Sequence, residues 1–445
     1  MWGSRFVVLV LIVVGLTAVC FMRVRQRTWM APSALFWLYW CAFLVSTFWL
    51  APSYTLTILG VAAIFGFGAI LSLGDFVGAT AAGRHGRVTR RWRLDFDRVS
   101  HYASKLTTLC IIASVIGCLA VVVYVIAAGY SLADMLSIKD VFAIASKYTA
   151  ARYQHPASYR EPNLAILFSI FVYVSALFGG SLFAISRKWR HKVASLLGFI
   201  PAFAISNLLT TRAAFLLTAL LWLSSYFAVN VSLSQGKYRL FSRRRVWGLL
   251  GLLIISLGVY AVGQVVRQGS YKTPNYEMVI ETMQSSFLGS TSSFTMWFSR
   301  NWDYFGPLGM GRRILSGPLQ WILPDFSRKS VSTFPAIILG HGDKPNENTT
   351  VAALFREVIF DFSILGAMPF FLILGAMGGY SFRRASRGNI LGIWMLSIFY
   401  GIALYSMMGF IFKFTVVLAA YVLYVLGMLY TFRIQSRAHG NGREI

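Results

Sequence analysis

The stretch Asn163–Ile185, with the sequence NLAILFSIFVYVSALFGGSLFAI, contains no charged residue. A helix of about 20 residues crosses the hydrocarbon core of a bilayer, so this stretch is long enough to span it. Comparable apolar runs recur along the chain, and they predict an all-α polytopic membrane protein with about eleven transmembrane helices. The predicted spans are 6–22, 32–50, 54–74, 107–129, 163–185, 193–209, 213–233, 246–266, 362–380, 389–410 and 411–432.

The composition agrees with this class of protein. Hydrophobic residues make up 57% of the chain, charged residues 13%, and the mean hydropathy is +0.64. This is too little charge to cover a water-soluble body of 445 residues, which excludes a soluble globular domain. The net charge of +26 occurs as short clusters between apolar runs rather than as one patch, so nucleic acid is not an expected partner. The cysteines lie inside apolar runs without metal-ligand spacing, and we expect neither a disulfide nor a metal site from them: Cys20, Cys41, Cys110 and Cys118.

Basic residues are distributed unevenly between the two sides of the predicted spans. The clusters on one side occupy residues 23–27, 84–105, 187–192, 237–245, 383–387 and 433–443. The positive-inside rule makes this side cytoplasmic, so the N-terminus is expected outside and the C-terminus inside. We expect these clusters to set the orientation and to contact anionic lipid. The first apolar run precedes its basic cluster, the reverse of a cleaved signal peptide, and is therefore expected to be a retained span.

Two long segments, residues 130–162 and 267–350, lie on the outer side. Both mix aromatic, acidic and basic residues in a way that is untypical of linkers. In the first, a helical pattern that includes Val141, Ile144 and Tyr148 predicts a helix lying flat on the membrane surface. The second precedes the ninth span, and its tryptophans and prolines favour short helices. We expect any chemistry to occur in these segments.

Arginines at the outer ends of the spans are candidate ligand-binding residues. Arg212 lies at the junction of two spans with almost no loop. There its guanidinium either reaches lipid phosphate or binds a phosphate group of a substrate through paired hydrogen bonds. Arg267 follows directly on the eighth span. Further cations in the long segment suit a polyanionic ligand: Arg300, Arg312, Arg313, Arg328 and Lys329.

Three charged residues enter the predicted ninth span together. The sequence predicts a helix that has Asn348 or Thr349 as its N-cap and runs into this span. Glu357 and Asp361 are four residues apart and share one helix face, and Arg356 adjoins Glu357. Two interpretations stay open. The charges form either a self-neutralising cluster that fixes the helix to its neighbours, or an acceptor-binding group with a carboxylate as general base.

Two further patterns carry less weight. Asp95-Phe-Asp97 matches the short acidic motif with which many sugar-nucleotide transferases hold a metal, but it lies in an arginine-rich inner loop where local charge balance explains it. His155 and His341 are the histidines on the outer side, and either can act as a base near neutral pH. A loop histidine is more often simply solvated.

Taken together, these features resemble the Wzy-type oligosaccharide repeat-unit polymerases. The resemblance runs from residue 130 onward and rests on the order of features rather than on a long identical stretch. The residues that carry it are Thr210-Thr211-Arg212-Ala213, Arg267 after the next span, Trp321-Ile-Leu-Pro324, Asn348-Thr349-Thr350, and Phe360-Asp361-Phe-Ser-Ile-Leu-Gly366. The family often has Gly where this chain has Ser363.

The resemblance implies a GT-C-like glycosyltransferase of the bacterial inner membrane, with a periplasmic active site, a periplasmic N-terminus and a cytoplasmic C-terminus. Its substrates would be oligosaccharides on undecaprenyl diphosphate. The growing glycan is transferred, with inversion, to the non-reducing end of the next lipid-linked repeat unit. The donor is already activated, and arginines stabilise the departing diphosphate, so neither a metal nor a cofactor is implied. The implied partners are membrane lipids, a chain-length regulator and a flippase.

The resemblance also implies roles for individual residues. The diphosphate is expected to bind Arg212 and Arg267, with Arg300, Arg312, Arg313 and Arg356 in support. Deprotonation of the acceptor hydroxyl is assigned to Glu357 or Asp361, with Asp303 and His341 in reserve.

Two other functions stay open. An O-antigen ligase, which moves the finished glycan onto the lipid A core, usually carries His-Asn near the end of its long outer loop, where this chain has Asn348-Thr349. A lipid-linked oligosaccharide flippase is expected to consist of two pseudo-symmetric halves with short loops on both sides. This chain has one dominant outer segment instead.

Overall fold

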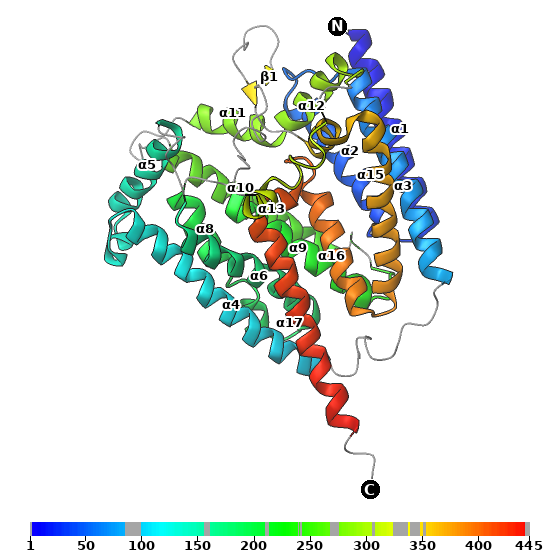
Figure 1. Ribbon diagram of the computed structural model, residues 1–445. Coiled ribbons are helices and arrows are strands. Elements are labelled where there is room, and N and C mark those ends of the chain that lie inside the picture. Colours follow the sequence, from blue (N-terminus) through cyan, green and yellow to red (C-terminus); the bar gives the residue numbers. More distant parts are fainter. Residues whose placement is uncertain are drawn as a thin grey trace. The chain divides into compact units, whose positions relative to one another are not determined.

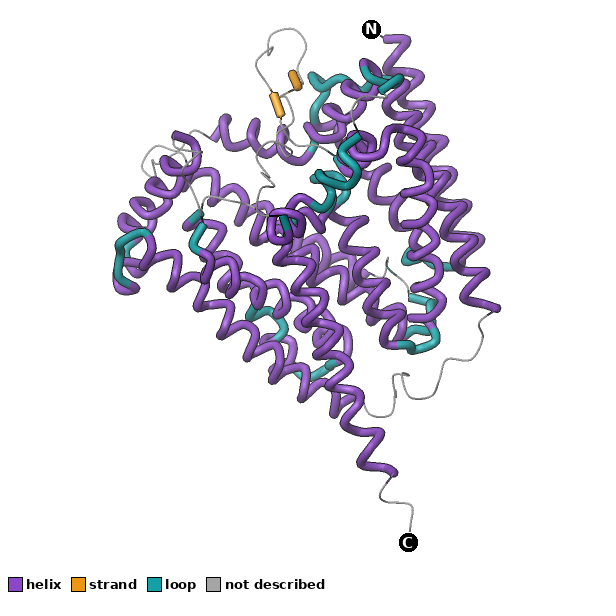
Figure 2. The backbone as a smooth tube through the Cα atoms, viewed as in Figure 1, coloured by secondary structure: helices purple, strands orange, loops and turns teal. Residues whose placement is uncertain are grey.

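Helices make up nearly all of the described part of the chain in this computed structural model (Figure 1). The structure describes residues 2–84, 99–154, 161–209, 213–238, 240, 243–267, 276–304, 308–323, 337–338, 348–349 and 353–440. Within these ranges the only strands are β1 (Ile337–Ile338) and β2 (Asn348–Thr349), which pair antiparallel (Figure 2). The helices in chain order are α1 (Trp2–Gln26), α2 (Pro32–Leu50), α3 (Ile58–Arg84), α4 (Val99–Ala127), η3 (Leu132–Leu136), α5 (Ile138–Gln154), α6 (Asn163–Ile185), α7 (Trp189–Ala194), α8 (Phe199–Leu208), α9 (Ala213–Leu233), α10 (Arg243–Arg267), α11 (Tyr276–Phe287), α12 (Gly289–Arg300), α13 (Ser316–Ile322), α15 (Leu354–Ser386), α16 (Ile390–Tyr405), η4 (Ile411–Lys413) and α17 (Thr415–Gly440).

Several of these helices match the thickness of a bilayer. Among the described residues, 7 helices are long and apolar enough to cross a membrane: Arg5–Gln26, Pro32–Leu50, Ile58–Gly83, Tyr102–Ala127, Asn163–Ile185, Ala214–Leu233 and Leu354–Ser386. Shorter apolar helices accompany them: Ile254–Val265, Ile390–Tyr405 and Thr415–Thr431. The chain is therefore an all-helical, polytopic membrane protein. The expectation of about eleven spans stays a prediction.

The boundaries of three predicted spans agree with the structure, and those of two others do not. α2, α6 and α9 have the predicted limits. The run 193–209 is instead divided between α7 and α8, because the turn after α7 lets Gly198 pack closely on α6, where an added Cβ would lie 2.8 Å from Ser175 Oγ. The run 411–432 is likewise divided into η4 and α17.

The predicted start of the charged helix is wrong. Asn348 and Thr349 belong to β2, and α15 begins at Leu354 with Ala353 as its N-cap residue. No side chain caps this end. The Leu354 N–H donates instead to the carbonyl of Ser406, at 2.7 Å, so the partner comes from the end of α16. A tertiary contact replaces the cap that local sequence suggests.

The chain divides into two compact units, and each combines segments that are far apart in sequence. The first unit contains Met1–Thr89, Ser234–Leu240 and Gln284–Thr415, and the second contains Arg90–Leu233, Phe241–Met283 and Val416–Ile445. In the first unit, α12 and the start of α1 lie at the same end, and α15 runs from that end to the opposite one (Figure 1).

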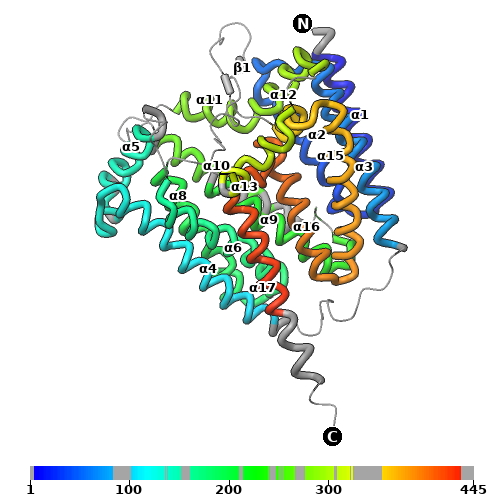
Figure 3. Tube along the Cα trace, in the orientation of Figure 1, coloured from blue at the N-terminus to red at the C-terminus, as the bar shows by residue number. Residues whose placement is uncertain are grey.

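Close contact between α3 and α15 organises the first unit (Figure 3). Both helices carry glycines four residues apart at the crossing. A Cβ on Gly74 would lie 2.1 Å from the carbonyl oxygen of Leu372, and one on Gly78 would lie 1.9 Å from that of Ala376. Small residues allow such close backbone approach, which is how helices associate in lipid without a hydrophobic driving force.

The buried carboxylate of Asp75 links three helices at the crossing of α3 and α15. Asp75 of α3 is 2% exposed. It accepts hydrogen bonds from the Ser33 N–H at 3.1 Å, from the Ser33 hydroxyl at 2.6 Å, and from Gln26 Nε2 at 3.0 Å. Ser33 lies in the first turn of α2, where backbone N–H groups lack helical partners. Asp75 therefore serves α2 as a cap supplied from another helix.

The second unit is built around α4, α6 and α9, joined by α17. An added Cβ on Gly180 would lie 2.0 Å from the Trp222 carbonyl oxygen, so α6 and α9 are in close backbone contact. Buried hydroxyls link the remaining helices. Ser114 and Ser175 are 2.6 Å apart, and Ser181 bonds the Tyr424 hydroxyl at 2.7 Å.

The helix predicted in segment 130–162 is present as α5 and packs within the second unit. Its Ile144 and Tyr148 are buried. The Tyr148 hydroxyl donates to the Tyr124 carbonyl, and Lys147 Nζ donates to the Ala128 carbonyl, both at 2.6 Å. These bonds fix α5 to the end of α4. Its orientation on a membrane surface stays a prediction.

Candidate functional site

A break in α15 separates a short charged segment from the apolar span that follows. Ser363 has φ 62° and ψ 178°, so residues 354–362 form a helix of their own. Arg356 and Asp361 are fully buried, and Glu357 is 4% exposed. The sequence predicts a continuous helix here, whereas the structure places the three charges inside the protein and leaves the apolar span to the residues after the break.

Glu357 is part of a buried ion pair. Its Oε1 lies 3.0 Å from Lys413 Nζ, and its other oxygen accepts the backbone N–H of Phe410. Gly409 has φ 124°, and an added Cβ there would lie 2.6 Å from both Glu357 Oε1 and Lys413 Nζ. Glycine at this position therefore lets the chain pass directly over the ion pair.

Asp361 fixes the position of the loop between α12 and α13 by hydrogen bonds. Its carboxylate accepts the N–H of Arg313, at 3.0 and 3.1 Å to its two oxygens, and the N–H of Ile314 at 2.9 Å. The break in α15 also frees two carbonyls, and the same loop satisfies them. The Gly309 N–H donates to the backbone carbonyl of Phe360 at 3.2 Å, and the Met310 N–H donates to the backbone carbonyl of Asp361 at 2.9 Å. The loop thus replaces the hydrogen bonds that the break removes.

Two guanidinium groups flank one aromatic ring. Cζ of Arg313 lies 4.7 Å from the centroid of Phe360, and Cζ of Arg356 lies 5.8 Å from it. Arg356 is also 5.5 Å from the Trp297 ring of α12, and Tyr304 packs against Phe360 at 4.9 Å. Such cation–π contacts offset part of the cost of burying a guanidinium. Burial lowers the pKa of Arg313, and the charge of Asp361 opposes this shift.

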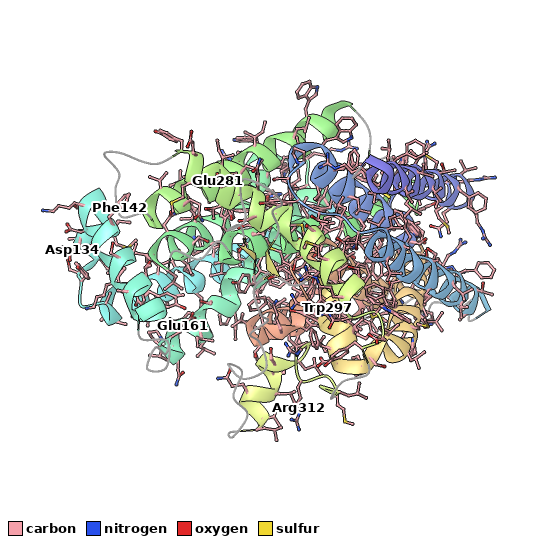
Figure 4. All side chains as sticks on the ribbon, turned by 90° about the horizontal axis from the view of Figure 1, so that it is seen from above. Asp134, Phe142, Glu161, Glu281, Trp297 and Arg312 are labelled. Carbon is pink, nitrogen blue, oxygen red and sulfur yellow. The ribbon has the colours of Figure 1, made fainter. Side chains whose placement is uncertain are left out.

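Four of the predicted site residues meet at this cluster: Arg313, Arg356, Glu357 and Asp361. The other described candidates do not join them. Arg300, Asp303 and Arg312 are exposed. Figure 4 shows Trp297 inside the first unit and Arg312 at its edge, with the Arg312 side chain directed outward. Arg312 and Arg313 are neighbours in sequence, but only Arg313 faces the buried carboxylate.

Several predicted residues lie outside the described part of the chain. These are Arg212 and His341, together with Asp95, Asp97, His155, Arg328 and Lys329. Arg267 is the last residue of α10, but its side chain also lies outside the described atoms. Their roles stay predictions.

Lys413 is a member of the cluster that the sequence did not indicate. It lies in η4, inside the apolar run 411–432, which was expected to be one transmembrane helix. The signal that could have found Lys413 is its position as a single lysine near the start of an apolar run, because a charge there needs a partner. Its partner, Glu357, lies on a different helix, so sequence spacing alone does not find the pair.

Among the described residues, the cluster has more cations than anions. Arg313, Arg356 and Lys413 face Glu357 and Asp361. Excess positive charge in a poorly solvated place attracts an anion, and guanidinium groups match phosphate through paired hydrogen bonds. Within the described residues no group of three or more His, Cys, Asp or Glu is able to hold a metal ion. The arrangement suits direct binding of an anion by side chains.

These features define a polytopic helical membrane protein with a buried, cation-rich cluster at the end of one span. No protein-family model, no curated protein and no solved structure matches the chain.

Proposed function

We propose that the chain is a polysaccharide polymerase of the Wzy type, acting at the periplasmic face of the bacterial inner membrane. It would transfer the growing glycan from undecaprenyl diphosphate to the next lipid-linked repeat unit. The observation that carries this proposal is the pair of guanidiniums, Arg313 and Arg356, held on one ring beside two carboxylates in a membrane protein. A diphosphate on a lipid is the ligand that needs both positive charge and a membrane.

Each residue of the cluster has a role in this reaction. Arg313, which is partly exposed, binds the diphosphate, and the buried Arg356 strengthens the positive potential behind it. The acceptor hydroxyl attacks the anomeric carbon of the growing glycan. The bond from that carbon to the diphosphate oxygen breaks, and its electron pair stays on the diphosphate. The proton of the hydroxyl passes to Glu357, whose carboxylate Lys413 orients.

Asp361, the alternative base, also has a positioning role. Its oxygens are engaged by backbone N–H groups of Arg313 and Ile314, so it fixes the place of Arg313. Arg212, Arg267 and His341 remain proposed members of the site on the resemblance alone.

The orientation in the membrane is part of the proposal. The basic residues Arg383 and Arg384 lie in the last turn of α15, at the opposite end of the helix from Arg356. If that basic end is cytoplasmic, as the positive-inside rule suggests, the cluster faces the periplasm. The same rule supports a periplasmic N-terminus and a cytoplasmic C-terminus. The proposed architecture is GT-C-like.

Reconstitution tests the activity directly. The purified chain in detergent is given lipid-linked repeat units purified from cells that lack this gene, without nucleotide or added metal. We expect a ladder of longer glycans together with free undecaprenyl diphosphate. If no product forms but the same protein in vesicles moves the lipid across the bilayer, the chain is a flippase and not an enzyme.

A matched pair of variants tests the diphosphate site. Arg313→Ala should lower polymer formation by about 100-fold or more, because it removes a charge that stabilises the leaving group. Arg312→Ala removes an equal charge one residue away, on the exposed side of the loop, and should change activity by less than about twofold. Equal losses in both variants would show that only overall loop charge matters.

Gene deletion distinguishes the ligase from the polymerase. Surface polysaccharide is resolved on a gel from cells that lack the chain. A single repeat unit on the lipid A core indicates a lost polymerase. A bare core indicates a lost ligase.

A further inference from the structure

Some buried hydroxyl groups of α12 form hydrogen bonds within the described part of the chain, and others do not. α12 has the sequence GSTSSFTMWFSR. At about 100° per residue, Ser292 and Thr295 share one face, while Ser290, Ser293 and Trp297 share the other. Ser290 and Ser293 are as completely buried as Ser292 and Thr295, each with no exposed surface. These four residues therefore differ in hydrogen bonding and not in exposure. Thr291, which lies nearer to the face of Thr295, is also buried, and its hydroxyl has no partner among the described residues.

The first face packs on the chain that leads into α3. The Ser292 hydroxyl donates to the Thr55 carbonyl at 2.7 Å. Thr57 Oγ1 donates to the Thr295 carbonyl at 2.6 Å, and the Thr295 hydroxyl donates to the Ser292 carbonyl at 3.0 Å. These bonds are local and structural, and they use the hydroxyl donors of Ser292 and Thr295.

The second face is directed toward the charged segment of α15. Trp297 contacts the Arg356 guanidinium at 5.5 Å, and Phe294, on the same side of α12, contacts Phe355 at 5.2 Å. Among the described residues, neither Ser290 Oγ nor Ser293 Oγ has a hydrogen-bond partner. A buried hydroxyl without a partner is costly, since most buried polar groups in proteins are bonded.

The neighbours of these hydroxyls indicate what would satisfy them. No carboxylate lies on this face of α12, so a cation has no counter-charge there. The anion-binding capacity lies beyond Trp297, at Arg356 and Arg313. A ligand with a neutral, hydroxyl-rich part attached to a diphosphate matches this arrangement, in which hydroxyl groups lie on one side of Trp297 and guanidinium groups on the other. Sugar rings also present C–H faces that pack on aromatic side chains such as Trp297 and Tyr304.

We propose that Ser290 and Ser293 form a sugar-binding subsite, in which they bond the hydroxyls of the pyranose nearest the diphosphate. This inference rests on the proposed function and names a part of that site. The two-residue strands β1 and β2 also contact α12.

The test compares binding of two ligands by the full chain in detergent. One is undecaprenyl diphosphate, and the other is the lipid-linked repeat unit purified from cells that lack this gene. Ser290→Ala/Ser293→Ala should bind the repeat unit about tenfold more weakly and bind undecaprenyl diphosphate as the wild type does. Without ligand, the double variant should melt at the same temperature or higher, because it removes two unsatisfied buried hydroxyls.

Ser292→Ala is the matched control. It loses the bond to Thr55 and should melt at a lower temperature, while both ligands bind normally. The proposal is overturned if the double variant binds the repeat unit as well as the wild type, or if it loses affinity for both ligands equally. Wild-type protein that binds neither ligand would refute the proposed function itself, and so the two failures are distinguishable.

Discussion

Two buried acidic sites in the first unit differ in how their charge is balanced. Asp75 of α3 accepts hydrogen bonds from the neutral donors of Ser33 and Gln26, and the charge of Arg383 also stabilises it. Glu357 and Asp361, at the start of α15, lie among three cations. The first arrangement is complete within the protein. Among the described residues, the second arrangement contains three cations and two carboxylates.

We therefore expect Asp75 to contribute to stability alone and Glu357 to contribute to both stability and function. Changes near Asp75 should lower the amount of folded protein without altering the activity of what remains. Changes near Glu357 should affect both properties. The predictions below follow from this difference, in order of decreasing effect.

The largest effect is expected at the α3–α15 crossing beside Asp75. Gly78→Leu places a side chain where a Cβ alone would lie 1.9 Å from a backbone oxygen of α15. The helices would have to separate, and we expect almost no folded protein in the membrane, measured by fluorescence-detected size exclusion. Gly66→Leu on the same helix is the control, because no atom lies within 4 Å of its added Cβ. Similar loss in both variants would mean that the close crossing is not what stabilises the unit.

The second prediction concerns the ion pair of the cation-rich cluster. Lys413→Met leaves the buried Glu357 carboxylate without its counter-charge, which should destabilise the protein by roughly 3 kcal/mol. We also expect polymer formation to fall sharply, since Glu357 then loses the side chain that orients its carboxylate. Lys413→Arg should restore most of both properties. Thermal melting and product yield per folded molecule measure the two effects separately.

The third prediction concerns the loss of the Asp75 carboxylate. Asp75→Ala removes the acceptor for the donors of Ser33 and Gln26, so we expect a loss of about 2 kcal/mol. Activity per folded molecule should stay within about twofold of the wild type, because no ligand is assigned to this end. A large loss of specific activity at normal stability would contradict the contrast between the two sites.

The smallest effect is a gain in stability at the break in α15. Ser363 has φ 62° and ψ 178°, a conformation that is almost confined to glycine. Ser363→Gly should therefore raise stability by about 1 kcal/mol. Ser381→Gly, in the regular part of the same helix, should instead lower it by about 1 kcal/mol. Equal changes of the same sign in the two variants would show that position 363 is not strained.

The family resemblance gains a physical interpretation at this residue. The Wzy-type polymerases that the sequence resembles often have Gly where this chain has Ser363, and a positive φ is a conformation that glycine adopts readily. From the sequence alone, Ser at this position is only a small departure from the family pattern. The backbone geometry identifies it as the place where the charged segment turns away from the apolar span.

The sequence by itself determined that this is a polytopic helical membrane protein, and it placed α2, α6 and α9 at their observed limits. Apolar length and flanking charge are properties of consecutive residues, so they can be read along the chain. It also identified Arg356, Glu357 and Asp361 as candidates, because charges that enter an apolar run need a partner or a function, and Arg313 as one of several cations in the long outer segment.

Only the tertiary structure decided which of these charges belong together. Lys413 meets Glu357 from 56 residues away, and Asp361 binds the backbone of Arg313 from 48 residues away. The breaks at Ser363 and between α7 and α8 depend on neighbouring helices in the same way. Such contacts arise from packing in three dimensions, where hydrogen bonds lost by one segment are supplied by another that no local pattern specifies.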